Sequence, residues 1–245
     1  NALISDAQRD LSSRIVSDIP GTTRDSSDSI VRHEGKEYVF VDTAGLRRKS
    51  KTEGELDIVS SLKSIQAMED SDVTVLVVDA SELTSKQEQR IAAMAVEAGK
   101  GIVILANKAD LLTNEERQEK EREMRIQLRF CDYAPILFVS AKTRTNLPKL
   151  FPLLESVARN RLRRIPTKEL LRWFEETVQR APGTIAKSKF VTQAKDIPPT
   201  FVLFCKKPAA IRTSDLRYLE NSLRATFAFD GTPMRWTTKG ESDND

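Results

Sequence analysis

The sequence predicts a doubly wound α/β domain followed by a smaller α+β domain. Three short apolar runs alternate with amphipathic helical patterns, which is typical of a largely parallel sheet covered on both faces. The runs lie at residues 73–78, 102–106 and 136–139. After residue 157 the pattern changes to a basic run and a second set of elements. We place the domains at residues 1–162 and 163–240, with a polar tail at 241–245.

The first domain is expected to open with a β-hairpin. Two β-type runs, 29–33 and 37–41, flank a turn at Gly35. His33, the only histidine, stands beside that turn and is expected on the surface. Helical patterns lie near residues 56–69, 86–98, 114–129 and 146–159.

The second domain is expected to have the order helix, strand, helix, strand. Thr167 could cap a helix that runs to Arg180, and Ser214 could cap a helix that runs to about Phe227. Strands are expected at 201–205 and 234–238. The intervening residues 181–200 are expected to form a polar loop.

Composition excludes several classes of function. The 39 basic and 36 acidic residues give a net charge of +3, which does not suggest a protein that coats nucleic acid. A single histidine argues against a His-based triad or a His-rich metal site. No apolar run approaches the ~20 residues that span a bilayer, so no membrane partner is expected. The two cysteines, Cys131 and Cys205, are expected to be buried free thiols in a cytoplasm or an organelle interior.

Four short segments carry the chemistry. They read PGTTRD at 20–25, DTAG at 42–45, NKAD at 107–110 and SAK at 140–142. Each of the last three comes directly after an apolar strand-like run. Ligands of open parallel sheets bind outside the carboxyl ends of the strands, so these segments are expected to converge on one edge.

The last two segments suit a guanine base. The Asp110 carboxylate offers two acceptor oxygens to the adjacent ring N–H and exocyclic amine of guanine, a pattern that adenine lacks. Asn107 can bridge the neighbouring loops, and the Ala141 N–H can meet the guanine oxygen. The expected base-binding residues are Asn107, Lys108, Asp110, Ser140, Ala141 and Lys142.

The first two segments suit the phosphates and a metal ion. Thr23 and Asp42 supply hydroxyl and carboxylate oxygens, which Mg2+ prefers. Gly45 lacks a Cβ, so its N–H can approach a terminal phosphate closely. Loss of that phosphate would release both segments and act as a switch. The expected phosphate-side residues are Thr22, Thr23, Asp42, Thr43, Ala44 and Gly45.

These segments resemble the G2 to G5 motifs of translation-factor-class GTPases. The stretches PGTTRD at 20–25 and DTAGLRRK at 42–49 narrow the resemblance to the Der (EngA) family. The second domain resembles the same family independently. Its matching stretches are PTFVLF at 199–204, RYLEN at 217–221 and GTP at 231–233. The resemblance covers nearly the whole chain.

The resemblance implies a P-loop GTPase domain followed by a KH-like domain. It further implies GTP and GDP binding, GTP hydrolysis, Mg2+ with K+ as a second candidate ion, and action in large-subunit ribosome assembly. Expected partners are the large ribosomal subunit precursor, its rRNA and a preceding GTPase domain. No catalytic residue is assigned, since Leu46 stands where Ras-like proteins have a water-orienting Gln.

One departure from the family pattern lies at the amino end. The family's first strand and its Gly-x-x-x-x-Gly-Lys-Ser phosphate loop are not present before Asn1. We therefore expect the natural protein to be longer here, and the chain alone to bind nucleotide weakly.

Two alternative functions stay open. The first is a non-catalytic ribosome-binding fragment or degenerate paralogue. The second is an Era-like or tRNA-modification GTPase, against which Arg47, Arg48, Lys49 and the second domain argue.

The second domain has no Gly-x-x-Gly loop between residues 167 and 227. KH domains that grip RNA use that loop, so a structural or docking role is favoured. Basic residues keep contact with rRNA open. They are Arg161, Arg163, Arg164, Lys187, Lys189, Lys206 and Lys207.

Overall fold

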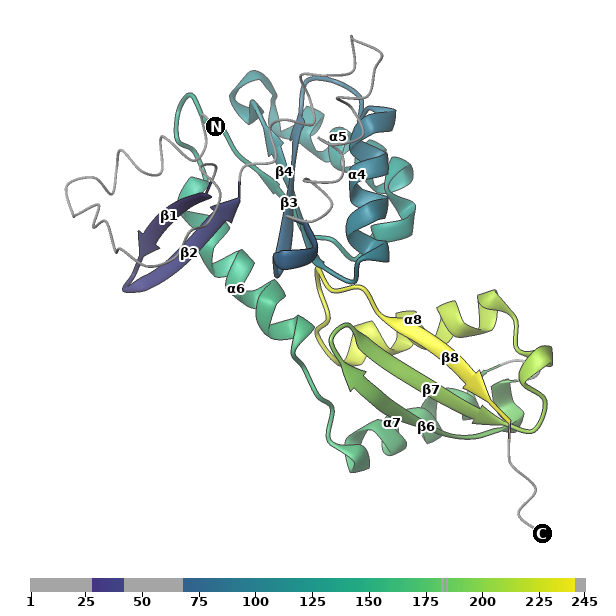
Figure 1. Cartoon of the computed structure of the whole chain (residues 1–245). Coiled ribbons are helices and arrows are strands. Elements are labelled where there is room, and N and C mark those ends of the chain that lie inside the picture. The colour runs from purple at the N-terminus through teal and green to yellow at the C-terminus, as the bar shows by residue number, and fades with distance from the viewer. Residues whose placement is uncertain (1–27, 42–67, 182, 184, 241–245) are drawn as a thin grey trace, which may run out of the picture.

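The computed structural model describes residues 28–41, 68–181, 183 and 185–240. Within these residues it contains a two-stranded hairpin, a three-stranded parallel sheet and a three-stranded mixed sheet (Figure 1). Most of the helix expected at 56–69 lies outside the described part of the chain. The predicted fold class, an α/β domain followed by an α+β domain, is confirmed.

The hairpin pairs β1 (Asp28–His33) with β2 (Lys36–Val41) in antiparallel register. Its turn residues Glu34 and Gly35 both have positive φ, as in the type I′ turns that close two-residue hairpins. The expectation that His33 is a surface residue is wrong. Its ring stacks on Phe151 with centroids 4.1 Å apart, and its side chain is only 23% exposed. No local pattern around the turn indicates this aromatic partner, which lies more than a hundred residues away.

The parallel sheet has the order β3 (Val73–Asp79), β4 (Gly101–Asn107), β5 (Ile136–Phe138). Helices α4 (Lys86–Glu97) and α5 (Asn114–Gln127) lie on one side of it, and α6 (Leu150–Arg161) lies on the other (Figure 1). In the described residues, no strand pairs with the outer edge of β3.

The central strand β4 is buried on both faces. Ile102 and Ile104 belong to the apolar cluster that includes residues of α4 and α5. Val103 and Leu105 belong to the cluster that includes residues of α6. Successive side chains of a strand point to opposite faces. Because both faces of β4 are buried, its sequence is a continuous apolar run. This burial explains why the sequence pattern identified the strand.

The second domain contains α7 (Thr167–Gln179), β6 (Ser188–Asp196), β7 (Pro199–Cys205), α8 (Thr213–Thr226) and β8 (Arg235–Lys239). Its sheet has the order β6-β7-β8, with β6 antiparallel and β8 parallel to β7. Both helices cover one face of this sheet (Figure 1). Side chains from helices and strands share one core around Phe174, Phe201 and Leu219.

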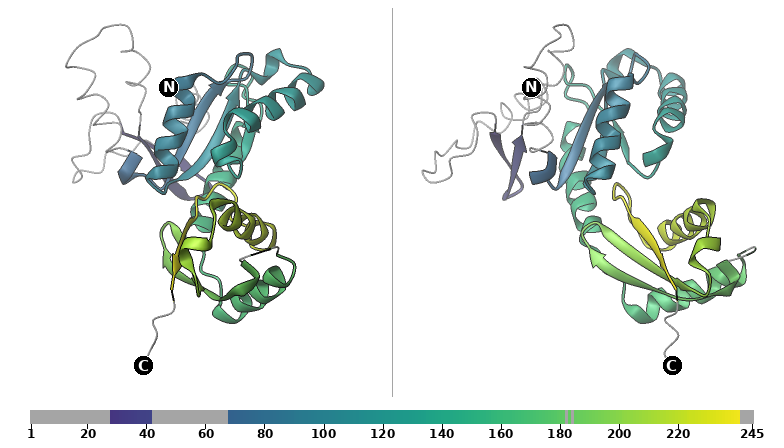
Figure 2. Two further views of the ribbon diagram at one scale, coloured as in Figure 1. Left: turned by 90° about the vertical axis from the view of Figure 1, so that its right-hand side faces the viewer. Right: turned by 45° about the vertical axis from the view of Figure 1, so that its right-hand side comes forward.

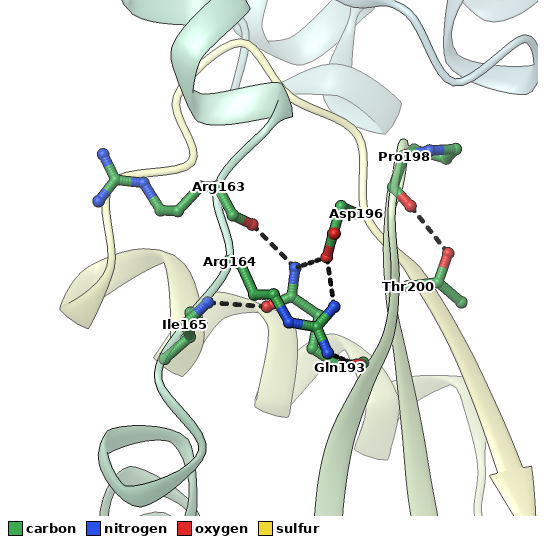
Figure 3. Close-up of polar contacts among 7 residues, drawn as sticks. All are labelled: Arg163, Arg164, Ile165, Gln193, Asp196, Pro198 and Thr200. Carbon is green, nitrogen blue, oxygen red and sulfur yellow. Dashed lines mark hydrogen bonds and ion pairs between the residues drawn. The ribbon is translucent and has the colours of Figure 1, made fainter.

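The expected polar loop at 181–200 is wrong, because β6 occupies nine of its twenty residues and β7 begins at Pro199. A polar residue, Gln193, stands at an inward position of this strand and is 4% exposed. Its amide is satisfied by backbone groups of the linker before α7 (Figure 3). Nε2 donates to the carbonyl of Arg163 at 2.8 Å, and Oε1 accepts from the N–H of Ile165 at 2.9 Å. A buried but paired amide hid the strand from the hydrophobic pattern.

The two expected helix caps of the second domain are also wrong. Thr167 is the first residue of α7, and Pro166 occupies the N-cap position. Arg212 precedes α8, and the Asp215 carboxylate accepts from the Arg212 N–H at 2.9 Å. Ser214 lies inside the helix. In both cases the helix starts earlier than a capping hydroxyl would place it.

The loop before β8 joins the two domains. Gly231 accepts a hydrogen bond from the N–H of Ile102 at 2.7 Å and donates one to the carbonyl of Tyr133 at 2.8 Å. The Asn160 amide, on α6, donates to the carbonyl of Asp230 at 3.1 Å. Figure 2 shows this loop reaching the end of the parallel sheet. The second domain is therefore anchored on the amino end of β4 and on α6.

Gly231 is the tightest point of this junction. Its φ is +71°, and an added Cβ would lie 2.4 Å from a methyl group of Val157. We expect Gly231→Ala to cost about 1–2 kcal/mol for the left-handed backbone and about 1–3 kcal/mol more for overpacking. Urea unfolding of the chain measures the loss.

Gly35→Ala is the matched control for this substitution. Gly35 also has positive φ, but no atom lies within 4 Å of its added Cβ. The Gly35→Ala variant should lose only the stability that the left-handed backbone conformation costs an alanine. Equal losses of stability in the two variants would contradict the packing argument for Gly231.

Candidate functional site

The parallel register brings the carboxyl ends of three strands to one edge. Asp79 at the end of β3 is the register partner of Asn107 at the end of β4. Val139 comes directly after β5, and its N–H donates to the carbonyl of Ala106 at 2.9 Å. The loops that leave this edge carry the Asn-Lys-x-Asp and Ser-Ala-Lys segments. We call the edge, with these loops, the carboxyl edge.

Asn107 ties the loops of the carboxyl edge together. Its side-chain Oδ1 accepts from the N–H of Ala141 at 3.0 Å. Its backbone carbonyl accepts from the N–H of Ala80 at 2.8 Å. Two residues on, the Ala109 N–H donates to the carbonyl of Val139 at 3.0 Å. One residue therefore links the loops after β3, β4 and β5, which confirms the expectation that Asn107 bridges neighbouring loops.

Lys108 adopts a left-handed conformation with φ of +65°, which turns the chain sharply after β4. Its ammonium forms an ion pair with Asp79, and its side chain is about half exposed. Burial alone would raise the pKa of Asp79. Hydrogen bonds from Lys108 and Ser81 outweigh that effect and hold the pKa below its usual value. Asp79 is thus an ionised partner that orients the Lys108 side chain.

Asp79 is a member of this edge that the sequence motifs did not predict. It closes the apolar run of β3 as Asn107 closes that of β4. A charged residue at the end of a buried strand was the available signal.

Asp110 presents an ionised carboxylate to solvent at the carboxyl edge. A hydrogen bond with Ser140 is the main cause that lowers its pKa, and the charges of Lys142 and Arg117 act in the same direction. Ser140 itself is 1% exposed and accepts from the N–H of Thr143 at 3.1 Å. A buried hydroxyl thus holds an exposed carboxylate in place and in its charged form.

Arg117 on α5 supports the same loop. Its Nε and Nη2 donate to the carbonyl of Ala109 at 3.2 and 2.7 Å. The pair of bonds has the geometry of the planar guanidinium fork. The peptide groups on both sides of Ala109 are therefore held, one by Val139 and the other by Arg117.

The structure gathers half of the sequence-predicted site residues at this edge. They are Asn107, Lys108, Asp110, Ser140, Ala141 and Lys142. The other predicted residues, Thr22, Thr23, Asp42, Thr43, Ala44 and Gly45, lie outside the described part of the chain. The described ranges contain no group of three or more His, Cys, Asp or Glu residues that could hold a metal ion.

Two protein families match the chain. A family described as 50S ribosome-binding GTPase matches residues 1–108. A family described as the KH-domain-like C-terminal domain of EngA bacterial GTPase enzymes matches residues 164–239. The two matches fall on the first and second domains respectively.

Curated relatives cover both domains together. GTPase Der of Natranaerobius thermophilus is 41% identical over 228 residues, which is 90% of this chain and 52% of the relative. GTPase Der of Agathobacter rectalis is 41% identical over 238 residues, or 94% and 54%. The chain spans about half the length of the curated relatives it matches.

Among solved structures, a crystal structure of Era in complex with MgGDPNP and nucleotides 1506–1542 of 16S ribosomal RNA matches 99% of this chain and 89% of that one. The sequence identity is 16% and the TM-score is 0.49.

Ser140→Ala should raise the pKa of Asp110 toward its ordinary value of 3.8, because the main hydrogen bond that favours the carboxylate is lost. Carboxyl carbon shifts in an NMR pH titration measure this pKa. The pKa of Asp110 in the folded protein lies below its value in the unfolded chain, and this sets the direction in which stability depends on pH. Any stability contributed by the charged form is present above the unfolded pKa and is lost as pH falls through the folded value.

Ser81→Ala is the control, because Ser81 donates to Asp79 through its hydroxyl at 2.6 Å. It should raise the pKa of Asp79 and leave that of Asp110 unchanged. A Ser140→Ala variant with an unchanged Asp110 titration would show that the hydroxyl does not set this pKa.

Proposed function

Because the chain belongs to the Der (EngA) family of GTPases, we propose that its protein binds guanine nucleotides and hydrolyses GTP to GDP and phosphate. We also propose that it acts in the assembly of the large ribosomal subunit. The observation that carries the proposal is the bond from the Ala141 N–H to the Asn107 side chain. That bond brings the Asn-Lys-x-Asp and Ser-Ala-Lys segments to one place.

The carboxyl edge has the groups that guanine recognition needs. The charged Asp110 carboxylate can accept from both the ring N–H and the exocyclic amine of guanine. Asn107, held by Ala141, keeps its amide nitrogen as a donor for the purine. The long Lys108 stem can lie along the base. Adenine would place an unpaired donor or acceptor against these fixed groups, which is costly.

Nucleotide hydrolysis involves the segments before and after the hairpin. β2 ends at Val41, so Asp42 comes directly after a described strand. We propose that the oxygens of Thr23 and Asp42 hold Mg2+, which would neutralise charge on the phosphates. K+ is the second proposed ion, by resemblance to the family. The N–H of Gly45 is the proposed sensor of the terminal phosphate.

The proposed setting is the cytoplasm, with the large-subunit precursor and its rRNA as partners and a preceding GTPase domain in the complete protein. Both cysteines are buried free thiols, which suits a reducing compartment. Burial raises the pKa of Cys131 to about 12, so its thiol is unreactive. None of the helices in the described ranges could span a lipid bilayer.

Asp110→Asn should change the base preference of the complete gene product from guanine to xanthine. Xanthine replaces the exocyclic amine with a carbonyl oxygen, and an Asn amide can accept from the ring N–H while donating to that oxygen. We expect GDP affinity to fall at least ~100-fold and affinity for xanthosine diphosphate to rise, because a buried mismatch of donors and acceptors is costly. Competition against a fluorescent nucleotide measures both.

Asp132→Asn is the matched control for this change. Asp132 is an exposed carboxylate that precedes β5, at the opposite end of the sheet. Its substitution should leave both affinities unchanged. Retention of full GDP affinity by Asp110→Asn would refute the proposed base contact.

Phosphate release from GTP by the complete gene product should require Mg2+ and exceed release from ATP by at least ~100-fold. Chelation with EDTA should abolish it, and K+ should support faster turnover than Na+. Purified large ribosomal subunits should stimulate turnover or co-sediment with the protein in the GTP form. Equal release from GTP and ATP would overturn the proposed activity.

A further inference from the structure

The outer face of the second-domain sheet departs from the usual pattern of a solvated sheet. Strand β7 alternates regularly, with Phe201 and Leu203 buried in the core that α7 and α8 cover. Its other positions point to the opposite face. An uncovered face is normally polar. Here two phenylalanines, Phe204 on β7 and Phe190 on β6, stand on it.

The two rings form a stacked pair. Phe190 and Phe204 are direct register partners, with ring centroids 4.2 Å apart and planes 14° from parallel. Phe190 is 42% exposed. Because β6 is an edge strand of the described sheet, no further strand there covers the side of Phe190 away from Phe204. The pair therefore presents aromatic surface to solvent.

Basic side chains lie on the same face of the sheet as these rings. Lys239 on β8 is the register partner of Phe204. Thr200 lies on this face four residues before Phe204 on β7. Its register partners are Lys195 on β6 and Arg235 on β8. All three basic side chains are exposed. We call Phe190, Phe204, Lys195, Arg235 and Lys239 the outer sheet patch.

Arg235 is held in place at the end of the patch nearer the first domain. Its Nη2 donates to the carbonyl of Glu97, the last residue of α4, at 2.8 Å. A guanidinium has five N–H donors, so this one bond leaves others for an anion.

The charge of the sheet differs from that of the helices behind it. The three strands carry four basic residues and one acidic residue, Asp196. Arg164 already pairs with Asp196 at 2.7 Å (Figure 3). By contrast, α7 carries two basic and three acidic residues, and α8 carries two of each. An anionic partner is therefore attracted to the sheet side and not to the helix side.

We propose that the outer sheet patch binds single-stranded RNA, with a base stacked on the aromatic pair and phosphates against Lys195, Arg235 and Lys239. The four residue steps from Thr200 to Phe204 span about 13 Å along β7, at ~3.3 Å per residue. This length suits about two or three nucleotides. Stacking on an aromatic ring beside a basic groove is how sequence-tolerant single-strand binding works. The site lies on the sheet and not on the helices, where KH domains carry their Gly-x-x-Gly loop.

A protein partner fits the patch less well than RNA. Covering Lys195, Arg235 and Lys239 with an apolar surface would bury three cations, which is costly without matching carboxylates. RNA supplies both a π-face for the rings and anions for the cations. This proposal rests on the proposed function only for the class of the partner, which is RNA. It adds the surface that binds that RNA.

A fluorescently labelled twelve-residue oligouridine, titrated with the full chain and followed by anisotropy, tests the proposal. Phe190→Leu keeps an apolar side chain but removes the π-face, and should weaken binding about tenfold with the salt dependence unchanged. Phe190→Trp should restore or exceed the original affinity. Lys239→Gln should weaken binding and reduce the slope of log K against log salt by about 0.7.

Lys168→Gln, an exposed charge on α7, is the matched control and should leave binding unchanged. Thermal unfolding confirms that each variant is folded. Phe190→Leu binding as tightly as the original chain would overturn the proposal, as would equal affinity for a twelve-base-pair RNA duplex or no oligouridine binding at all. Guanine-nucleotide binding is measured separately on the complete gene product, and Phe190→Leu should leave it intact, so the two proposals fail independently.

Discussion

Apolar packing around a single strand, β4, holds the rest of the first domain in position. β4 is covered by α4 and α5 on one face and by α6 on the other, and it pairs with a parallel strand along each edge. Burial of a side chain such as Ile104 stabilises the fold by roughly 1.5–3 kcal/mol. A strand held this firmly can position polar groups at both of its ends.

The carboxyl end of β4 positions the candidate site. Asn107 ends the strand, and its amide fixes the loop after β5 through Ala141. The charged side chains of the adjacent loops are held by neighbouring groups and not by their own stiffness. Asp79 orients Lys108, and the buried hydroxyl of Ser140 supports Asp110. The donors and acceptors of the edge are thus held by contacts within the protein, and such preorganisation lowers the cost of binding.

Most of this arrangement could be predicted from the sequence, because it depends on apolar runs and on the polar segments directly after them. The strands at 73–78, 102–106 and 136–139 were predicted, and so was the convergence of their loops. Two of the missed features, strand β6 and the stacked ring of His33, share one cause: a polar or aromatic residue satisfied by a distant partner. Gln193 is paired with the linker before α7, and His33 stacks on Phe151. Local pattern contains no information on either contact.

The amino end of β4 explains how the two domains can work as one body. Ile102 donates to Gly231 of the loop before β8, about 17 Å along the strand from Asn107 at ~3.3 Å per residue. α6 provides a second connection, since Val157 packs against both β4 and Gly231. In the described part of the chain, a displacement at the carboxyl edge can therefore reach the second domain through stiff elements, β4 and α6. The outer sheet patch lies on the face of β6-β7-β8 away from the helices, and these connections set its orientation to the carboxyl edge.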